Sequence, residues 1–361
     1  MQKRSLVLVC GLFLAACDGS NTVETGGGGS GSGASNSGGN GGVGGNGGVG
    51  GNGGDGGQGA GSSNQSFTVT FDPVTVSPGT ERTQCVVKRV GNDTAIKVHE
   101  IHNVLPQGSH HLIVYRTNDT VEAPDPVDCE PFVDTLDPAK GSPLMVTQKP
   151  DETLTLPDGV GFVLDADVMV RLEMHYLNAG AADIEVSATS TFVTMPEAEF
   201  ENAADFLFIG NPDVSVDANS SATLGPTFLP LPANLAGSKF FGITGHTHQW
   251  GTNVTVDYAE SSQGPDTSVY DVPGWQWNEP ATVTLDPPLE VATGGGFRFT
   301  CEWNNTSSLS AGFGESANDE MCFFWAYYYP SKGAFVCAHT DQVPGGLDVC
   351  CPGSPLCDQL F

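Results

Sequence analysis

The sequence predicts an all-β protein of two antiparallel, jelly-roll-like β-sandwich domains. Short runs of alternating apolar and polar residues recur along the chain, and this period of two is typical of strands with one buried face. The runs occupy residues 66–71, 93–101, 110–117, 167–176, 252–258, 297–303 and 323–329. Turn-forming Pro, Gly, Asn and Asp separate them, and no stretch shows sustained helical periodicity.

The first segment, residues 1–17, is expected to be a lipoprotein signal peptide. Lys3 and Arg4 precede an apolar run over 6–16, and the string Leu-Ala-Ala-Cys that ends at Cys17 resembles a bacterial lipobox. Cys17 would then become the lipidated N-terminus, and the protein would be anchored in the bacterial cell envelope, on the periplasmic or the cell-surface side. The alternative is an ordinary cleaved signal peptide with an incidental cysteine.

Three further segments follow. Residues 18–64 consist largely of Gly, Asn and Ser, which bury too little apolar surface to offset the entropy of ordering, so a disordered linker is expected. We place the N-terminal sandwich at 65–195 and the C-terminal sandwich, with a cysteine-rich tail, at 196–361. The 361 residues leave room for two domains of ordinary size after the leader and the linker.

The charge of the chain argues against nucleic acid as a partner. The formal net charge is -29, and Lys and Arg together number only 13, so no basic surface is available for phosphate backbones. The expected partners are therefore a small-molecule substrate and the lipid anchor. The sequence does not indicate the oligomeric state.

The cysteines indicate an oxidising compartment. Ten occur in the chain, and eight remain once Cys10 and Cys17 are set aside with the signal, an even number that suits disulfides. The pairing within the C-terminal group stays open, except that adjacent Cys350 and Cys351 do not easily bond to each other. A Cys-only zinc knot competes there, although the group contains no C-x-x-C pair. This C-terminal group comprises Cys337, Cys350, Cys351 and Cys357.

Histidines gather in three strings of this histidine-poor chain, which has 8 in all. In GHTHQW, His246 and His248 share one face of a strand and form a ready chelate, because side chains alternate with period two. Adjacent His110 and His111 in GSHHLIVY normally point to opposite faces, so joint ligation there requires a bulge or a strand end. His175 falls on the more polar face of its run, 167–176.

Met321, in the string NDEMCFF, selects among metals. A thioether is a soft, weak ligand that suits Cu(I) and offers little to Zn(II) or Mg(II). A site made of His246, His248 and Met321 therefore favours copper, whereas a site made only of histidines suits copper, zinc or iron about equally. One site of each kind is expected.

Taken in order, the HH, lone His, HTH and DEMC strings resemble the copper type II, ascorbate-dependent monooxygenases, which include the peptide-amidating hydroxylases and the dopamine-type β-hydroxylases. The resemblance runs from about Phe67 to Tyr329. It implies two copper ions per chain, O2, and ascorbate or another reductant as co-substrate. One copper would transfer electrons in the first domain and one would bind oxygen in the second, so each copper would belong mainly to one domain, with a gap between them.

The resemblance also assigns residues. The electron-transfer copper would be held by His110, His111 and His175, and the oxygen-binding, catalytic copper by His246, His248 and Met321. It further implies the disulfides Cys85 with Cys129 and Cys301 with Cys322.

The substrate position departs from the amidating enzymes. Thr244 stands where those enzymes carry an arginine for the substrate carboxylate. By alternation, Phe323, Trp325 and Tyr327 share a face with Met321, so an apolar or aromatic small substrate is expected there.

Two other function classes remain open. A non-catalytic copper-binding or copper-storage lipoprotein of the envelope needs the same ligands without turnover. A zinc hydrolase with a three-histidine site is also conceivable, but it leaves Met321 without a role and has no evident general base nearby.

Overall fold

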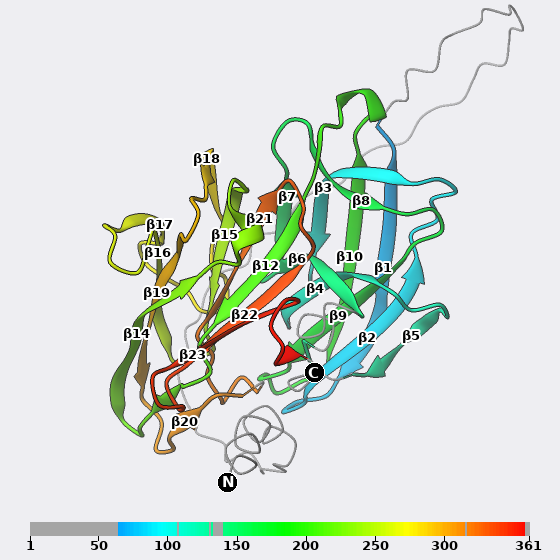
Figure 1. Ribbon diagram of the computed structural model, residues 1–361. Helices are drawn as coiled ribbons and strands as arrows, with labels where there is room; N and C mark the ends of the chain where they lie inside the picture. The colour runs from blue at the N-terminus through cyan, green and yellow to red at the C-terminus, as the bar shows by residue number, and fades with distance from the viewer. Residues whose placement is uncertain (1–63, 107, 130, 133–139, 315, 358–361) are drawn as a thin grey trace, which may run out of the picture.

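The computed structural model describes residues 64–106, 108–129, 131–132, 140–314 and 316–357, and their regular structure is almost entirely β (Figure 1). The predicted all-β class is confirmed. Two short 3-10 helices, η1 (Glu197–Glu199) and η2 (Ala233–Leu235), are the only helices formed by these residues, and neither is long enough to cross a membrane. The predicted signal, Cys17 and all of the predicted linker except Asn64 lie outside the described residues.

The first sandwich has two sheets. One has the order β1-β10-β3-β8-β11, with β7 also paired to β3, and the other has the order β5-β2-β9-β4-β6. The strands are β1 (Ser66–Val76), β2 (Glu81–Arg89), β3 (Ile96–Val104), β4 (Ser109–Thr117), β5 (Ala123–Asp128), β6 (Gly141–Thr147), β7 (Asp151–Thr155), β8 (Val160–Leu164), β9 (Met169–Leu177), β10 (Ile184–Thr194) and β11 (Asn202–Ala203).

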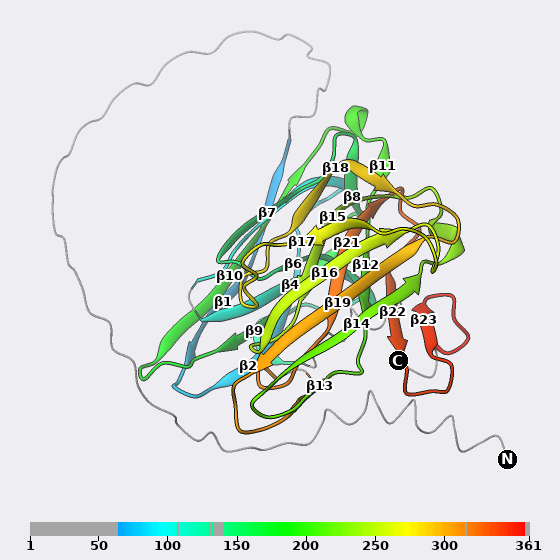
Figure 2. The ribbon, with the colours of Figure 1, turned by 90° about the vertical axis from the view of Figure 1, so that its left-hand side faces the viewer.

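The second sandwich pairs a sheet of order β18-β15-β21-β12-β22-β23 with a sheet of order β14-β19-β16-β17, and β13 and β20 form a separate ribbon. Figure 2 views this sandwich with the four-stranded sheet in front. The strands are β12 (Asp205–Gly210), β13 (Ser215–Val216), β14 (Ser220–Pro230), β15 (Lys239–His246), β16 (Gly251–Ala259), β17 (Thr267–Asp271), β18 (Val283–Glu290), β19 (Gly296–Asn305), β20 (Ala311–Gly312), β21 (Phe323–Tyr329), β22 (Phe335–Thr340) and β23 (Leu347–Cys351).

The chain passes from one sandwich to the other between Ala203 and Asp205. β11 still pairs with β8 of the first sandwich, and β12 then pairs with β21 and β22 of the second. The change of sheet thus comes several residues after the predicted boundary between 195 and 196.

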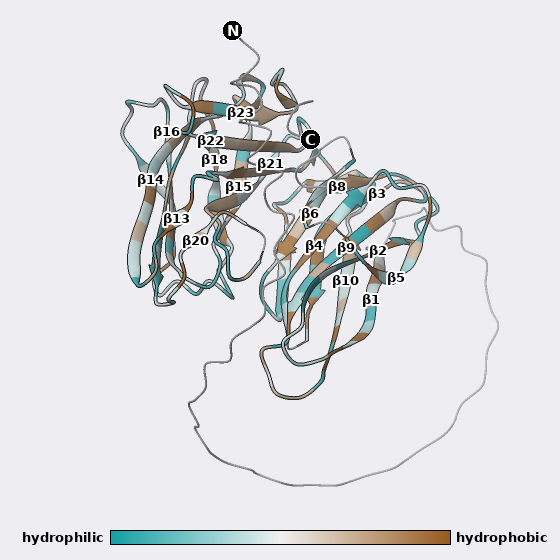
Figure 3. Cartoon of the chain, turned by 90° about the horizontal axis from the view of Figure 1, so that it is seen from below, coloured by the Kyte–Doolittle hydropathy of each residue, from teal (hydrophilic) through white to brown (hydrophobic). Residues whose placement is uncertain are grey.

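Strand burial shows where the two sandwiches meet. β10 alternates buried and partly exposed residues, as a strand with one solvated face does. By contrast, β6 and β12 are buried at every position, and β15 and β21 at every position but one. Strands buried on both faces lie between two layers, so the sheet with β6 and the sheet with β12 face each other. Figure 3 shows the two sandwiches side by side.

Period-two alternation divides the side chains of β12 and β21 between two cores. Phe324, Ala326 and Tyr328 join the internal core of the second sandwich. The intervening Phe323, Trp325 and Tyr327, together with Met321, belong to a cluster that is continuous with the core of the first sandwich. These four residues do share a face, as alternation predicts. That face is covered by the first sandwich.

Four disulfides link the described cysteines. The two implied by the family resemblance, Cys85–Cys129 and Cys301–Cys322, are present. The C-terminal cysteines, whose pairing the sequence did not determine, form the disulfides Cys337–Cys350 and Cys351–Cys357. All four are therefore in disulfides, and no zinc knot is formed there.

Replacing both Cys301 and Cys322 by serine is expected to lower the free energy of unfolding by about 3 kcal/mol, because the bond constrains a long loop in the unfolded chain. The two cysteines are 21 residues apart, and both are fully buried. Urea titration followed by tryptophan fluorescence measures the loss. The matched control is the double serine variant of Cys351 and Cys357, which are 6 residues apart and should cost less; an equal or larger loss in the control would contradict the prediction.

Candidate metal centre

The first three predicted histidine ligands meet on adjacent strands. His110 and His111 lie at the start of β4, where the pairing with β9 shifts register between Ser109 and His111. The shift lets neighbouring side chains converge, although in a regular strand they would point apart. On β9, His175 is the direct partner of His111, and one ring nitrogen from each histidine lies within 4.8 Å of the others. The predicted bulge or strand end at the His-His pair is therefore confirmed.

The second histidine pair, His246 and His248, lies at the end of β15. His246 is the last residue of that strand, His248 follows it in the loop, and their ring centroids are 5.1 Å apart. His246 pairs with Phe323, the first residue of β21. Glu320, the neighbour of Met321, accepts a hydrogen bond from the backbone N–H of His248 at 2.9 Å, and the side chain of Met321 is buried. The local chain path thus places all three predicted ligands of the second copper at one end of this sheet.

The two histidine sets lie against each other. The ring of His110 is 6.2 Å from the ring of His248 and 6.5 Å from that of His246, measured between centroids. His111 is 6.2 Å from His246. Distances within the first set are 5.1–5.3 Å, only about 1 Å shorter. Among the described side chains, the two histidine sets are therefore neighbours across the junction of the two sandwiches.

Hydrogen bonds orient three of the rings. His246 donates from Nδ1 to Oε1 of Gln148, at 2.7 Å, and His248 donates from Nδ1 to the carbonyl oxygen of Asp319, at 3.2 Å. Each bond leaves Nε2 with its lone pair free for a metal. In His175 the pattern is reversed: Nε2 contacts the Glu81 carboxylate at 3.0 Å, so Nδ1 is the nitrogen that would bind a metal.

The remaining ring nitrogens fit a metal. Buried polar atoms are almost always hydrogen-bonded in native proteins, yet several histidine nitrogens here are buried without any partner among the described residues. They are Nε2 of His110, both nitrogens of His111, Nε2 of His246 and Nε2 of His248. Neutral imidazole suits copper, zinc and iron, and the nearby thioether narrows the set to copper.

Burial keeps the histidines neutral. Loss of hydration is the first cause that lowers the pKa of His110, His111 and His246 well below the ordinary value, and the neighbouring histidines lower it further. For His248, burial and His175 lower the pKa to about 4. Metal binding requires deprotonated imidazole, so the four rings are ready to ligate at neutral pH.

The metal-free protein is expected to lose stability on acidification. A histidine with a folded pKa below its unfolded value of 6.5 binds fewer protons when folded, so its contribution is complete above pH 6.5 and is lost toward pH 4 for His248. Each such histidine contributes up to about 1.4 kcal/mol per pH unit. Four carboxyls with a pKa raised by burial oppose this: Glu152, Asp205, Asp319 and, most strongly, Glu320, at about 7 instead of 4.5. The histidines outweigh them, because the pKa of His110, His111 and His246 is lowered further than that of the first three carboxyls is raised. The urea midpoint of the metal-free protein is therefore expected to fall between about pH 7 and pH 5, and a constant midpoint would contradict this prediction.

Glu320 fixes the loop that carries His248. Its carboxylate is fully buried and accepts hydrogen bonds from the backbone N–H groups of His248 and Trp250, at 2.9 and 2.7 Å, and from the indole N–H of Trp303, at 2.8 Å. Because Glu320 directly precedes Met321, the same residue ties the histidine loop to the methionine segment.

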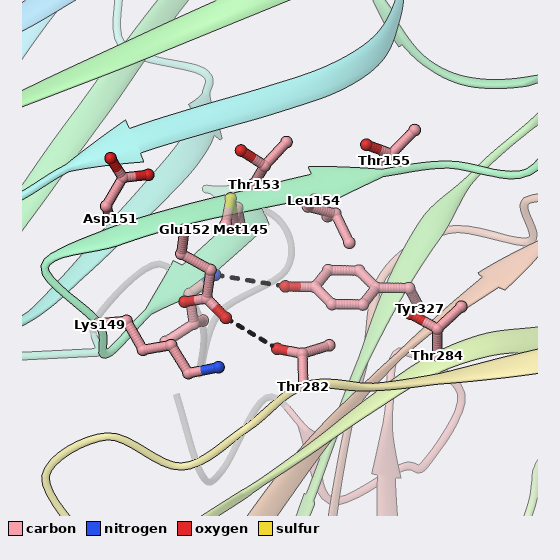
Figure 4. A pocket seen from close by; sticks show the side chains of 11 residues that line it. Met145, Lys149, Asp151, Glu152, Thr153, Leu154, Thr155, Thr282, Thr284 and Tyr327 are labelled. Carbon is pink, nitrogen blue, oxygen red and sulfur yellow. Dashed lines mark hydrogen bonds between the residues drawn. The ribbon is translucent and has the colours of Figure 1, made fainter.

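A cavity of about 250 Å³ opens between the sandwiches, lined from β6 and β7 on one side and from β18 and β21 on the other (Figure 4). Val146 and Lys149, which flank Gln148, contribute to its lining, as does Tyr327. Tyr327 accepts a hydrogen bond from the Val146 backbone N–H at 3.4 Å. Glu152, with a pKa raised by burial, accepts from Thr282 at 3.1 Å.

The four predicted substrate residues have different surroundings. Thr244 is buried, and its hydroxyl lies 2.8 Å from that of Thr282, which lines the cavity. Of the aromatic residues, Tyr327 lines the cavity, whereas Phe323 stacks on Phe208 at a centroid distance of 5.0 Å. Trp325 is buried in the shared core.

Sequence reasoning missed the residues that support the histidines from afar. Gln148 lies 98 residues from His246, and Glu81 lies 94 residues from His175. Trp277, whose ring is 5.2 Å from that of His110, belongs to a loop of the other sandwich. No local motif marks any of these three, because their role depends on how the sandwiches pack.

Fold and side chains thus define an all-β protein of two sandwiches with a buried histidine cluster, suited to a metal, at their junction. Residues 217–343 match the family model of the copper type II ascorbate-dependent monooxygenase, C-terminal domain. The match confirms, for this segment of the chain, the family resemblance inferred from the motifs. The match includes His246, His248 and Met321; the first histidine set lies outside it.

Solved structures give only weak likenesses. The major capsid protein P2 from bacteriophage PM2 is 8% identical, with 75% of this chain and 100% of that chain covered and a TM-score of 0.33. PNGase F, a glycosylasparaginase from Flavobacterium meningosepticum, is 10% identical, with 79% and 99% covered and a TM-score of 0.36. At such TM-scores neither likeness indicates a shared function.

Proposed function

We propose that the chain is a copper-dependent monooxygenase that hydroxylates a C–H bond of a small substrate with O2 and ascorbate or another reductant. The observation that carries the proposal is the convergence of five histidines from distant strands, with four of them offering buried, unpartnered nitrogens. The second set and Met321 lie in the segment that matches the copper monooxygenase family.

The residues have distinct roles in this proposal. His110, His111 and His175 hold one copper, and His246, His248 and Met321 hold another, so that the chain carries two ions. When bound, copper supplies one-electron redox chemistry that no side chain can provide. The protein supplies neutral imidazoles in fixed orientations, a soft thioether that favours Cu(I), and a buried environment from which bulk water is largely excluded.

The cavity beside Gln148 is the proposed substrate site. Tyr327 offers an aromatic wall, in keeping with the expected apolar or aromatic body of the substrate. Thr244 connects through Thr282 to the carboxylate of Glu152, at the position where the amidating enzymes carry an arginine. The Glu152 carboxylate can accept a hydrogen bond from a hydroxyl or amino group of the substrate, and it would repel a substrate carboxylate.

A copper-storage protein is the second candidate. Its support is the depth of the cluster, since His111, His175, His246 and His248 are each at most 4% exposed. Storage requires retention of the ions, without turnover.

Oxygen consumption with ascorbate separates the two functions. The copper-loaded chain is expected to consume O2 in excess of free copper at the same concentration, and Met321→Ala is expected to lose that excess. Met195→Ala is the matched control, because this buried methionine shares a pocket with His99 and with none of the five clustered histidines, and it should leave the rate unchanged. Tight copper binding with no O2 uptake above free copper would favour storage.

For localisation, we propose a lipid anchor at Cys17 that holds the sandwiches at the envelope. The support is the lipobox-like string and the Gly-rich segment after it. Cys17→Ala should move the protein from the detergent phase to the aqueous phase in a phase-partition assay, and an unchanged distribution would argue against the anchor.

A further inference from the structure

We propose that Trp277 of the second sandwich covers the entrance through which copper and an external reductant reach the first histidine set, and that this entrance lies at His110. The inference rests on the proposed function for the identity of the metal and for the need of a reductant. It assigns a role to the loop between β17 and β18, which contributes none of the expected ligands.

His110 is the least buried of the five clustered histidines. It is partly exposed, whereas His111, His175, His246 and His248 are each at most 4% exposed. Its Nε2 atom is nevertheless buried and has no hydrogen-bond partner among the described residues. Part of the ring therefore meets solvent, while a nitrogen that is free to bind a metal is covered.

The cover comes from Trp277. Five rings contact that of His110, and four of them belong to the other clustered histidines. The fifth is the indole of Trp277, with its centroid 5.2 Å away and its plane tilted by 51°. Trp277 is itself partly exposed, so the indole lies between solvent and the first histidine set.

The loop that carries Trp277 is held in place on both sides of it. Residues 272–282 connect β17 to β18 without regular secondary structure. Trp275 is buried and packs edge-to-face on Tyr270, with centroids 6.1 Å apart. The hydroxyl of Tyr270 donates to the carbonyl oxygen of Ala281 at 3.0 Å. The indole is thus presented by an anchored loop.

The tip of this loop is a single turn. The backbone N–H of Glu279 donates to the carbonyl oxygen of Gln276 at 3.2 Å and so encloses Trp277 and Asn278. Gln276, Asn278 and Glu279 are all exposed. Trp277 is therefore the one side chain of the turn that packs against the histidines, and its exposed neighbour Gln276 offers a matched control.

The indole also favours the metal-bound form of the ring beneath it. The face of an indole attracts a cation that lies within about 6 Å of its centroid. An imidazole that ligates copper carries part of the positive charge of the ion. Loss of the indole should therefore uncover His110 and also weaken the retention of copper by the first set.

Modification of the metal-free chain by diethyl pyrocarbonate, followed at each histidine by mass spectrometry, tests the cover. His110 is expected to react slowly in the wild-type chain and several-fold faster in Trp277→Ala. Gln276→Ala should leave the rate at His110 unchanged, and Trp277→Phe, which keeps a ring, should stay close to the wild type. An unchanged rate at His110 in Trp277→Ala would overturn the proposal.

Other histidines in the same sample show whether the chain stays folded. His99 and His102 lie outside the cluster and should react at equal rates in the wild type and in Trp277→Ala. His246 is buried and should remain slow in both. Acceleration at His246 as large as that at His110 would indicate a general opening of the junction and would overturn the assignment of the cover to Trp277.

A second experiment tests the passage of copper and reductant. In a His246→Ala background only the first set is expected to hold copper. Trp277→Ala in that background should release copper to EDTA several-fold faster. Without O2, ascorbate should also reduce its Cu(II) several-fold faster, as measured by loss of the electron paramagnetic resonance signal. Slower reduction would overturn the proposal, because it would mean that Trp277 assists the reductant.

The outcomes separate this inference from the proposed function. The modification experiment uses no metal, so its failure would remove the cover and leave the monooxygenase in place. Absence of ascorbate-dependent O2 uptake by the copper-loaded wild-type chain would remove the monooxygenase and leave the cover at His110.

Discussion

Glu320→Ala is expected to lower the free energy of unfolding by about 3 kcal/mol or more, because each buried donor left without an acceptor costs about 1–3 kcal/mol. Three donors lose their acceptor at once: the backbone N–H groups of His248 and Trp250 and the indole of Trp303. No water or neighbouring carboxylate replaces a fully buried group easily. Urea titration of the metal-free protein measures the loss, and a change under about 1 kcal/mol would contradict it.

Two variants show whether the effect arises from these bonds. Glu302→Ala removes an exposed glutamate beside Trp303 and should be nearly neutral. Glu320→Gln keeps the shape and one carbonyl oxygen, so its loss should fall between the other two. If Glu302→Ala were as damaging as Glu320→Ala, general disruption of β19 and its neighbours would explain both.

His246→Ala is expected to reduce the copper content from two ions to one and to abolish ascorbate-dependent O2 uptake. The substitution removes a ligand of the second set and leaves Gln148 without its partner. It also opens the contact with His110 and His111. Elemental analysis and an oxygen electrode measure the two effects.

His339→Ala is the control for this variant. His339 is bonded to Asp348 at 2.7 Å and to Asp341 at 3.3 Å, among the C-terminal strands, and belongs to neither histidine set. It should keep both coppers and the full rate. Loss of copper in His339→Ala, or full O2 uptake in His246→Ala, would contradict the assignment of the second set.

Features that depend on local periodicity were predictable from the sequence. The alternation that places Met321, Phe323, Trp325 and Tyr327 on one face is a property of a single strand, and the structure keeps it. The irregular start of β4 follows from the same rule, because adjacent His110 and His111 converge only where regular pairing is broken.

Features that depend on how the sandwiches pack were not predictable in this way. The shared face could be assigned by alternation, but whether solvent, substrate or a second sheet covers it is decided by surfaces far apart in sequence. The same holds for Gln148 and Glu81, whose partners are nearly a hundred residues away. The distance between the two histidine sets also depends on this packing, which brings His110 within 6.5 Å of His246 and His248 between ring centroids.

The most direct test of the central claim is the metal content of the purified chain after exposure to copper and zinc together, followed by dialysis. The account predicts two copper ions per chain, because five imidazoles, each offering one nitrogen, and one thioether form a donor set that favours copper over zinc. A single zinc ion, or no metal retained, would contradict the assignment of the histidine cluster as a copper centre.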